Sequence, residues 1–118
     1  MTKKEMKDGI REIWVDQIKT AMYMADEAIE NCADDGTCNF DMVMVKKEKT
    51  FTYTETIAIF ETCGIMASKM SERGRGYSGW IGLPHYRGQA EKNTRWAETF
   101  RDWLKSAGFE TSMYYQCD

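Results

Sequence analysis

The residues with the clearest chemical potential lie in one segment, 73–87, which combines glycines with basic and aromatic side chains. Guanidinium groups attract phosphates and aromatic rings stack on bases, so this combination is typical of a site for a nucleotide or a single-stranded nucleic acid. The alternative is that Trp80, Ile81 and Leu83 pack onto a sheet while the arginines face solvent. The candidate binding residues are Arg73, Arg75, Tyr77, Trp80, His85, Tyr86 and Arg87.

Residues 74–79 of this segment read GRGYSG and match the dinucleotide-binding pattern G-x-G-x-x-G. That pattern works where it follows a strand and opens a helix, because the helix N-terminus then faces the pyrophosphate. Here it follows a predicted helix and runs into Trp80 and Ile81. We therefore interpret these glycines as forming a turn or a hairpin.

A second candidate surface is acidic, since no Lys or Arg occurs between Lys19 and Lys46. Acidic side chains near the C-terminal end of a helix oppose its macrodipole, and like charges one turn apart repel each other. Stability alone does not favour this pattern, so it indicates either a surface that docks on a basic partner or a solvated acidic face. The candidate partner-binding residues are Asp26, Glu27, Glu30, Asp34 and Asp35.

Catalytic and metal-binding motifs are weak in this sequence. His85 is the only histidine and the four cysteines contain no C-x-x-C pair, which disfavours zinc. A Cys63–His85 pair of nucleophile and base is possible in space, but Cys63 lies on an apolar stripe typical of a buried, inert thiol. Residues 34–41 lack the alternating ligands of a calcium loop. We expect no enzyme activity, no metal and no cofactor.

Composition indicates a globular protein in the cytoplasm. The 118 residues are 42% hydrophobic and 30% charged, and they form no apolar run of membrane-spanning length and no signal-like N-terminus. We therefore expect reduced thiols at Cys32, Cys38, Cys63 and Cys117, with a Cys32–Cys38 disulfide left open. The net charge of −3 conceals a dipolar chain, because residues 69–105 hold eight basic groups and four acidic ones.

The elements that position these residues begin with a long amphipathic helix. Thr2 and Glu5 form a predicted capping box, and apolar residues recur every three or four positions from Met6 to Cys32. Residues 34–36, with sequence DDG, are the predicted stop. The alternating residues 40–45 and 50–54 predict a β-hairpin, although residues 54–60 fit either the second strand or a helix. We expect that helix to run from Glu55 to Arg73, with Thr52 and Glu55 as a second predicted capping box. Gly64 inside it costs up to about 1 kcal/mol against alanine and is the main argument against this helix.

The last third of the chain predicts a helix followed by a strand. Trp96, Phe100, Trp103, Leu104 and Ala107 share one helical face. Gly108 and Phe109 fit a Schellman cap, and residues 110–116 alternate as a strand does. The sequence thus predicts a single α+β domain over residues 1–118, with a mostly antiparallel three-stranded sheet packed by N-terminal, middle and C-terminal helices.

From these patterns we expect a small non-enzymatic protein that binds a macromolecular protein partner through the acidic helix end, the 73–87 loop, or both. Compact acidic domains of this size are common among phage-encoded inhibitors of host defence, which is an analogy of size and charge. The alternative is that the loop binds a nucleotide or a single-stranded nucleic acid. Neither the partner nor the oligomeric state follows from the sequence.

Overall fold

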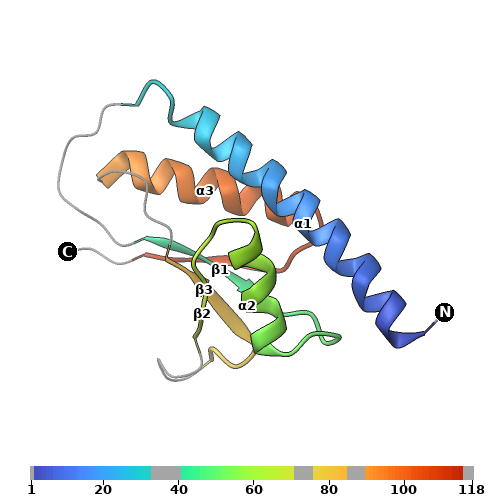
Figure 1. Ribbon diagram of the computed structural model, residues 1–118. Helices are drawn as coiled ribbons and strands as arrows, with labels where there is room; N and C mark the ends of the chain where they lie inside the picture. The colour runs from blue at the N-terminus through green and yellow to red at the C-terminus, as the bar shows by residue number, and fades with distance from the viewer. Residues whose placement is uncertain (1, 33–40, 71–75, 85–89, 116–118) are drawn as a thin grey trace.

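The computed structural model describes residues 2–32, 41–70, 76–84 and 90–115 (Figure 1). It is an α+β fold in which three helices pack against a four-stranded antiparallel sheet of order β2-β3-β1-β4. The elements in chain order are α1 (Lys3–Ala28), β1 (Met42–Lys46), α2 (Tyr53–Thr62), β2 (Ser68–Lys69), β3 (Trp80–Leu83), α3 (Ala90–Ser106) and β4 (Thr111–Tyr114).

The predicted α+β class, the long first helix and its capping box are confirmed. The Thr2 hydroxyl accepts from the Glu5 amide at 3.1 Å, and the Glu5 carboxylate reaches back to the Thr2 amide. The helix ends at Ala28, before the predicted stop at residues 34–36, which lies outside the described residues. Its inward stripe is Ile18, Ala21 and Ala25, whereas Met6 and Ile13, predicted on that stripe, are exposed.

The predicted hairpin of residues 40–54 is wrong, because only its first strand forms. Residues 53–54 belong instead to α2, which the second capping box starts: the Thr52 hydroxyl accepts from the Glu55 amide at 3.1 Å. This local signal overrides the β propensity of the preceding alternating residues. The partners of β1 come from farther along the chain, with Val45 opposite both Ile81 and Thr111.

The predicted helix from Glu55 to Arg73 is also too long, since α2 ends at Thr62. Gly64 has a φ of +90°, and the amides of Gly64 and Ile65 donate to the carbonyls of Glu61 and Phe60, each at 3.0 Å. These two bonds form a Schellman cap. The chain then enters β2, and residues 80–83, predicted as part of a long loop, form β3. The sheet therefore has four strands where three were expected.

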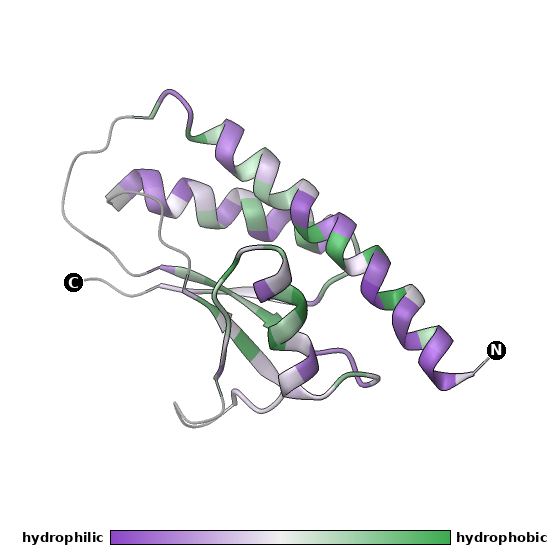
Figure 2. Cartoon of the chain, in the orientation of Figure 1, coloured by the Kyte–Doolittle hydropathy of each residue, from purple (hydrophilic) through white to green (hydrophobic). Residues whose placement is uncertain are grey.

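The helices cover one face of the sheet, with α2 against β2 and β3 and with α3 against β1 and β4. Helix α1 lies across α2 and α3 and forms few contacts with the strands (Figure 1). Figure 2 shows hydrophobic residues along β1, β3 and α2, where these layers meet. The buried residues of this helix-side core include Ile18, Ala21, Val43, Val45, Ile59, Phe60, Ile81, Leu83, Trp96, Phe100 and Leu104.

The C-terminal helix and strand are confirmed. The amides of Gly108 and Phe109 donate to the carbonyls of Lys105 and Leu104 in the predicted Schellman cap. The buried face of α3 is narrower than the sequence predicts, however. Trp103 is 42% exposed and Ala107 is also exposed, so neither belongs to the core.

A second, smaller cluster lies on the other face of the sheet and contains no residue from a described helix. We call it the methionine cluster: Met42, Met44 and Met70 are buried, and Tyr77, Trp80 and Tyr114 pack around them. Met44 lies opposite Gly82 and Ser112 in the strand register, which places the cluster across the middle of the sheet. Tyr77 and Trp80 thus have packing roles, whatever else they do.

Candidate functional site

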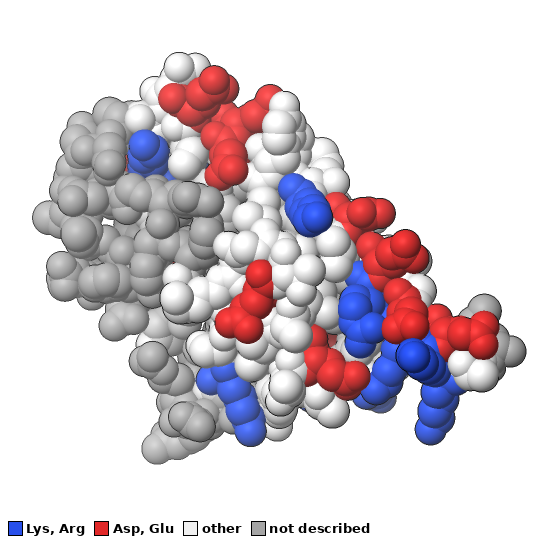
Figure 3. Space-filling model, in the orientation of Figure 1, with Lys and Arg blue, Asp and Glu red and all other residues white. Residues whose placement is uncertain are grey.

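The predicted acidic residues that the structure describes gather at the C-terminal end of α1. Asp26 and Glu27 lie in its last turn and Glu30 follows it, whereas Asp34 and Asp35 lie outside the described residues. Figure 3 shows acidic side chains grouped at this end of the molecule, at the top of the view. Along the first half of α1, by contrast, acidic and basic side chains alternate. Along α1, one sign of charge therefore dominates at the C-terminal end.

A tyrosine that the sequence analysis missed completes this surface. Tyr23 is 62% exposed, and with Asp26, Glu27 and Glu30 it lines an open groove of about 460 Å³. We call these four residues the acidic groove. Tyr23 precedes Glu27 by four positions and lies off the buried stripe of α1, and that helical spacing is the signal that could have identified it.

The acidic groove affects the ionisation of Tyr23. A hydrogen bond with the Glu27 side chain raises the pKa of the Tyr23 hydroxyl above its ordinary value, and the negative charge of Glu27 and then of Glu30 adds to the effect. Both causes disfavour a second negative charge on the phenol. The raised pKa of Tyr23 therefore reflects first its hydrogen bond to Glu27 and then the negative charge of the groove.

The acidic residues differ in what they contact. Asp26 Oδ1 accepts a 2.7 Å hydrogen bond from Trp96 Nε1, which links α1 to the buried ring on α3. Asp26 is therefore a structural residue as well as a surface charge. Glu27 and Glu30 are exposed and form no salt bridge within the described part of the chain. Their negative charge also opposes the helix dipole, and the last turn of α1 holds no basic residue to offset this.

Only part of the predicted 73–87 site can be placed. Arg73, Arg75, His85, Tyr86 and Arg87 lie outside the described residues, and Tyr77 and Trp80 remain. Both rings are half-buried against the methionine cluster, and the Tyr77 ring meets that of Tyr114 at 6.4 Å. Gly76 and Gly79 have φ values of +84° and +85° within the connection between β2 and β3, which supports the interpretation of these glycines as hairpin-forming.

The fold brings together a basic group that the sequence does not reveal. Lys46 Nζ lies 6.0 Å from the centre of the Trp80 ring. Lys47 and Lys69 Nζ lie 5.6 and 4.4 Å from the centre of the Tyr53 ring. We call these five residues the lysine–aromatic cluster. It lies where α2 and β3 begin, away from the C-terminal end of α1 (Figure 1).

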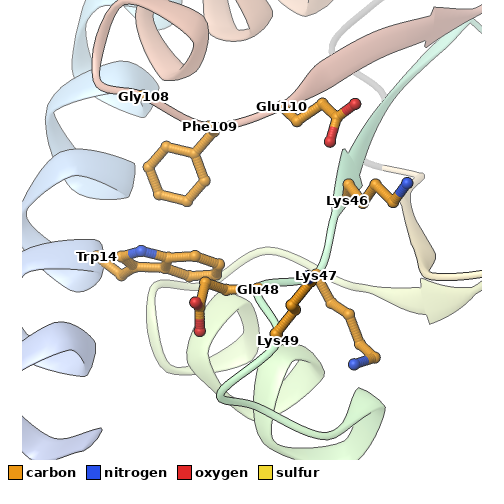
Figure 4. Close-up of a pocket in the computed structure, with 8 residues that line it drawn as sticks. All are labelled: Trp14, Lys46, Lys47, Glu48, Lys49, Gly108, Phe109 and Glu110. Carbon is orange, nitrogen blue, oxygen red and sulfur yellow. The ribbon is translucent and has the colours of Figure 1, made fainter. Parts of the chain in front are cut away.

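A separate groove of about 400 Å³ lies between α1 and the two connections that follow β1 and α3. Figure 4 shows its floor formed by the rings of Trp14 and Phe109, whose centres are 4.5 Å apart, with Glu48 and Glu110 on its rim. The ammonium groups of Lys46 and Lys47 point away from these rings. Glu48, Glu110 and Lys49 also line this groove, so charges of both signs surround it.

Cys63, the candidate nucleophile, is 9% exposed and its thiol donates to the Val15 carbonyl at 3.8 Å. Burial raises the pKa of this thiol, which lowers the fraction of reactive thiolate. Cys32 and Cys63 both have free thiols, and Cys38 lies outside the described residues.

The described residues contain no group of three or more His, Cys, Asp or Glu that could hold a metal ion. No helix among them is both long and apolar enough to cross a membrane.

Comparison with known proteins found no matching family model, no similar curated protein and no similar solved structure. Function is therefore inferred from the chemistry of the acidic groove and the lysine–aromatic cluster.

Proposed function

We propose that the protein is a non-enzymatic binding module that docks on a basic surface of a protein partner through the acidic groove. The observation that carries the proposal is the pairing of Glu27 and Glu30, exposed and without a salt bridge to a described residue, with the exposed ring of Tyr23. Their charges sit where the helix dipole disfavours them, so stability does not account for the arrangement.

The chemistry of the groove supports a basic protein as the partner. Two exposed carboxylates, those of Glu27 and Glu30, match lysine or arginine side chains, and the exposed Tyr23 supplies both apolar area and a polar hydroxyl, as interface tyrosines do. A basic surface of this kind is typical of proteins that bind nucleic acids. The narrower form of the proposal is an inhibitor that occupies such a surface in a host defence complex, as phage-encoded inhibitors do; size and charge support it.

A matched pair of double variants tests the proposal. Glu27→Lys/Glu30→Lys reverses the groove, whereas Glu12→Lys/Asp16→Lys makes the same charge change on exposed residues earlier in α1. Asp26 is left intact because of its bond to Trp96. Circular dichroism first confirms that both variants keep the helical content of the wild type.

Affinity capture from an extract of the native host, followed by mass spectrometry, is the measurement. We expect the wild type and the control pair to retain the same basic protein, and the groove variant to lose it. Salt should release the partner, because screening weakens surface attraction between charges. Retention of the same partner by the groove variant, or release that is independent of salt, would overturn the proposal.

A further inference from the structure

The lysine–aromatic cluster concentrates positive charge around one tyrosine. Lys47 follows β1 and Lys69 lies in β2, yet their ammonium groups lie over the same Tyr53 ring. Because both distances are measured from one ring centre, the two nitrogens are no more than about 10 Å apart. The two cations are thus close enough to act on one strand of phosphates.

Hydrogen bonds fix this arrangement. The Tyr53 hydroxyl accepts a hydrogen bond from the Gly79 amide, which holds the ring against the start of β3. Lys47 Nζ also donates to the Phe51 carbonyl at 3.0 Å. Trp80 follows Gly79 directly, but its half-buried ring and Lys46 lie on the methionine-cluster face of the sheet, around the strand end from Tyr53. The site therefore has two placed cations on the helix side of this strand end and an aromatic ring with a third cation on the other side.

These charges are held without being neutralised. An aromatic ring attracts an ammonium group through its quadrupole but carries no net charge. Lys46, Lys47 and Lys69 form no salt bridge within the part of the chain that the structure describes, whereas Lys7 pairs with Glu55 at 3.2 Å. Bringing like charges together is unfavourable for folding, and a bound anion would relieve the repulsion.

We propose that the lysine–aromatic cluster binds the phosphate of a nucleotide, either free or within a single strand. Lys47 and Lys69 contact phosphate oxygens beside Tyr53, and the ring of Trp80, around the end of the strand, offers a surface on which a neighbouring base stacks. Cations that follow the backbone next to aromatic rings are the combination found in sites for single-stranded nucleic acids. An acidic peptide would use the cations but not the ring. This inference is independent of the proposed protein-binding function.

The test compares two variants that remove the same charge. Lys47→Gln/Lys69→Gln alters the cluster, and Lys92→Gln/Lys105→Gln alters lysines on α3. Because Lys47 also donates to the Phe51 carbonyl, the single variant Lys69→Gln is a second probe that keeps this bond. Binding is measured by calorimetry and by tryptophan fluorescence with a nucleoside monophosphate, a short single-stranded oligonucleotide and an acidic peptide.

We expect the wild type and the α3 variant to bind the oligonucleotide, and the cluster variant to bind it at least about tenfold more weakly. The slope of log Kd against log salt concentration should fall by about 1.4 for two lost contacts with a single strand. Lys69→Gln alone should lower the slope by about half as much, since it removes one contact. Binding of the monophosphate as well identifies a free nucleotide as a ligand, whereas binding of the oligonucleotide alone identifies a strand.

Three results would overturn the proposal. The first is the absence of heat and of quenching with both phosphate ligands. The second is an equal loss of affinity in the α3 variant, which would indicate a general effect of charge. The third is binding of the acidic peptide as tightly as the oligonucleotide. None of these results bears on capture of a protein by the acidic groove, so the two proposals fail separately.

Discussion

The sulfur of Met70 lies directly over Gly82, at the centre of the sheet face that carries the methionine cluster. A Cβ added to Gly82 would come within 2.5 Å of this sulfur and within 3.3 Å of Met70 Cγ. Met70 is 2% exposed, so the side chain has little room to move away. Glycine at this position lets the methionine pack against the backbone of β3.

Gly82→Ala should therefore lower the free energy of unfolding by about 1–3 kcal/mol through overpacking, measured by urea denaturation. Gly9→Ala is the control, because Gly9 lies in α1 with no atom within 4 Å of its added Cβ. That change should raise stability by about 0.5–1 kcal/mol. In a Met70→Ala background the Gly82→Ala substitution should cost much less, and simple additivity would refute the close contact.

Stability at acidic pH should depend on Glu55. A hydrogen bond from the Thr52 amide, and then one from Lys7, hold the pKa of this carboxyl below its ordinary value of 4.5. Because the folded pKa is the lower one, the stabilisation is present above the unfolded value and disappears as pH falls through the folded value. The melting temperature of Glu55→Gln should vary less than that of the wild type between neutral pH and about pH 3. Glu12→Gln, the control, should follow the wild type.

Tyr23 should titrate at a lower pH when Glu27 loses its charge. The hydrogen bond to Glu27 is the largest cause of the raised pKa, so Glu27→Gln should move that pKa toward the ordinary value of 10.0. The titration can be followed by the NMR shift of the ring carbon that bears the hydroxyl. The control Glu12→Gln should leave the curve unchanged, and an unchanged curve in Glu27→Gln would contradict the electrostatic account of the acidic groove.

The thiol of Cys63 should react slowly with an alkylating reagent in the folded protein. It is buried and its pKa is raised, whereas Cys32 is only partly buried. Mass spectrometry of the alkylated peptides should show Cys32 modified well before Cys63, with the difference lost in denaturant. Rapid modification of Cys63 under native conditions would instead revive the hypothesis of a catalytic nucleophile.

Features set by short-range chemistry were the ones that the sequence predicted. Both capping boxes formed, and so did the Schellman cap at Gly108, because each depends on residues three to five positions apart. By propensity alone Gly64 is a cost inside the predicted helix, whereas in the structure its positive φ ends that helix. The strand at Trp80 was missed because the glycines around it resemble a loop.

The candidate sites also differ in how far the sequence alone can predict them. Glu27 and Glu30 follow from the charge pattern of one helix, and Tyr23 could have been added from its spacing. The lysine–aromatic cluster could not be foreseen, because Lys69 meets Tyr53 only once β2 pairs with β3 and α2 packs beside them. Nothing in the local sequence of either residue specifies that contact.

The strand order also sets a sequence of events during synthesis. Both neighbours of β1 are made after it: β3 pairs Leu83 with Val43, and β4 pairs Thr111 with Val45. Until they emerge from the ribosome, the apolar run of β1 has two open edges on which other chains can assemble. The interval before β4 is complete is therefore when a nascent chain is most exposed to aggregation, however stable the finished sheet becomes.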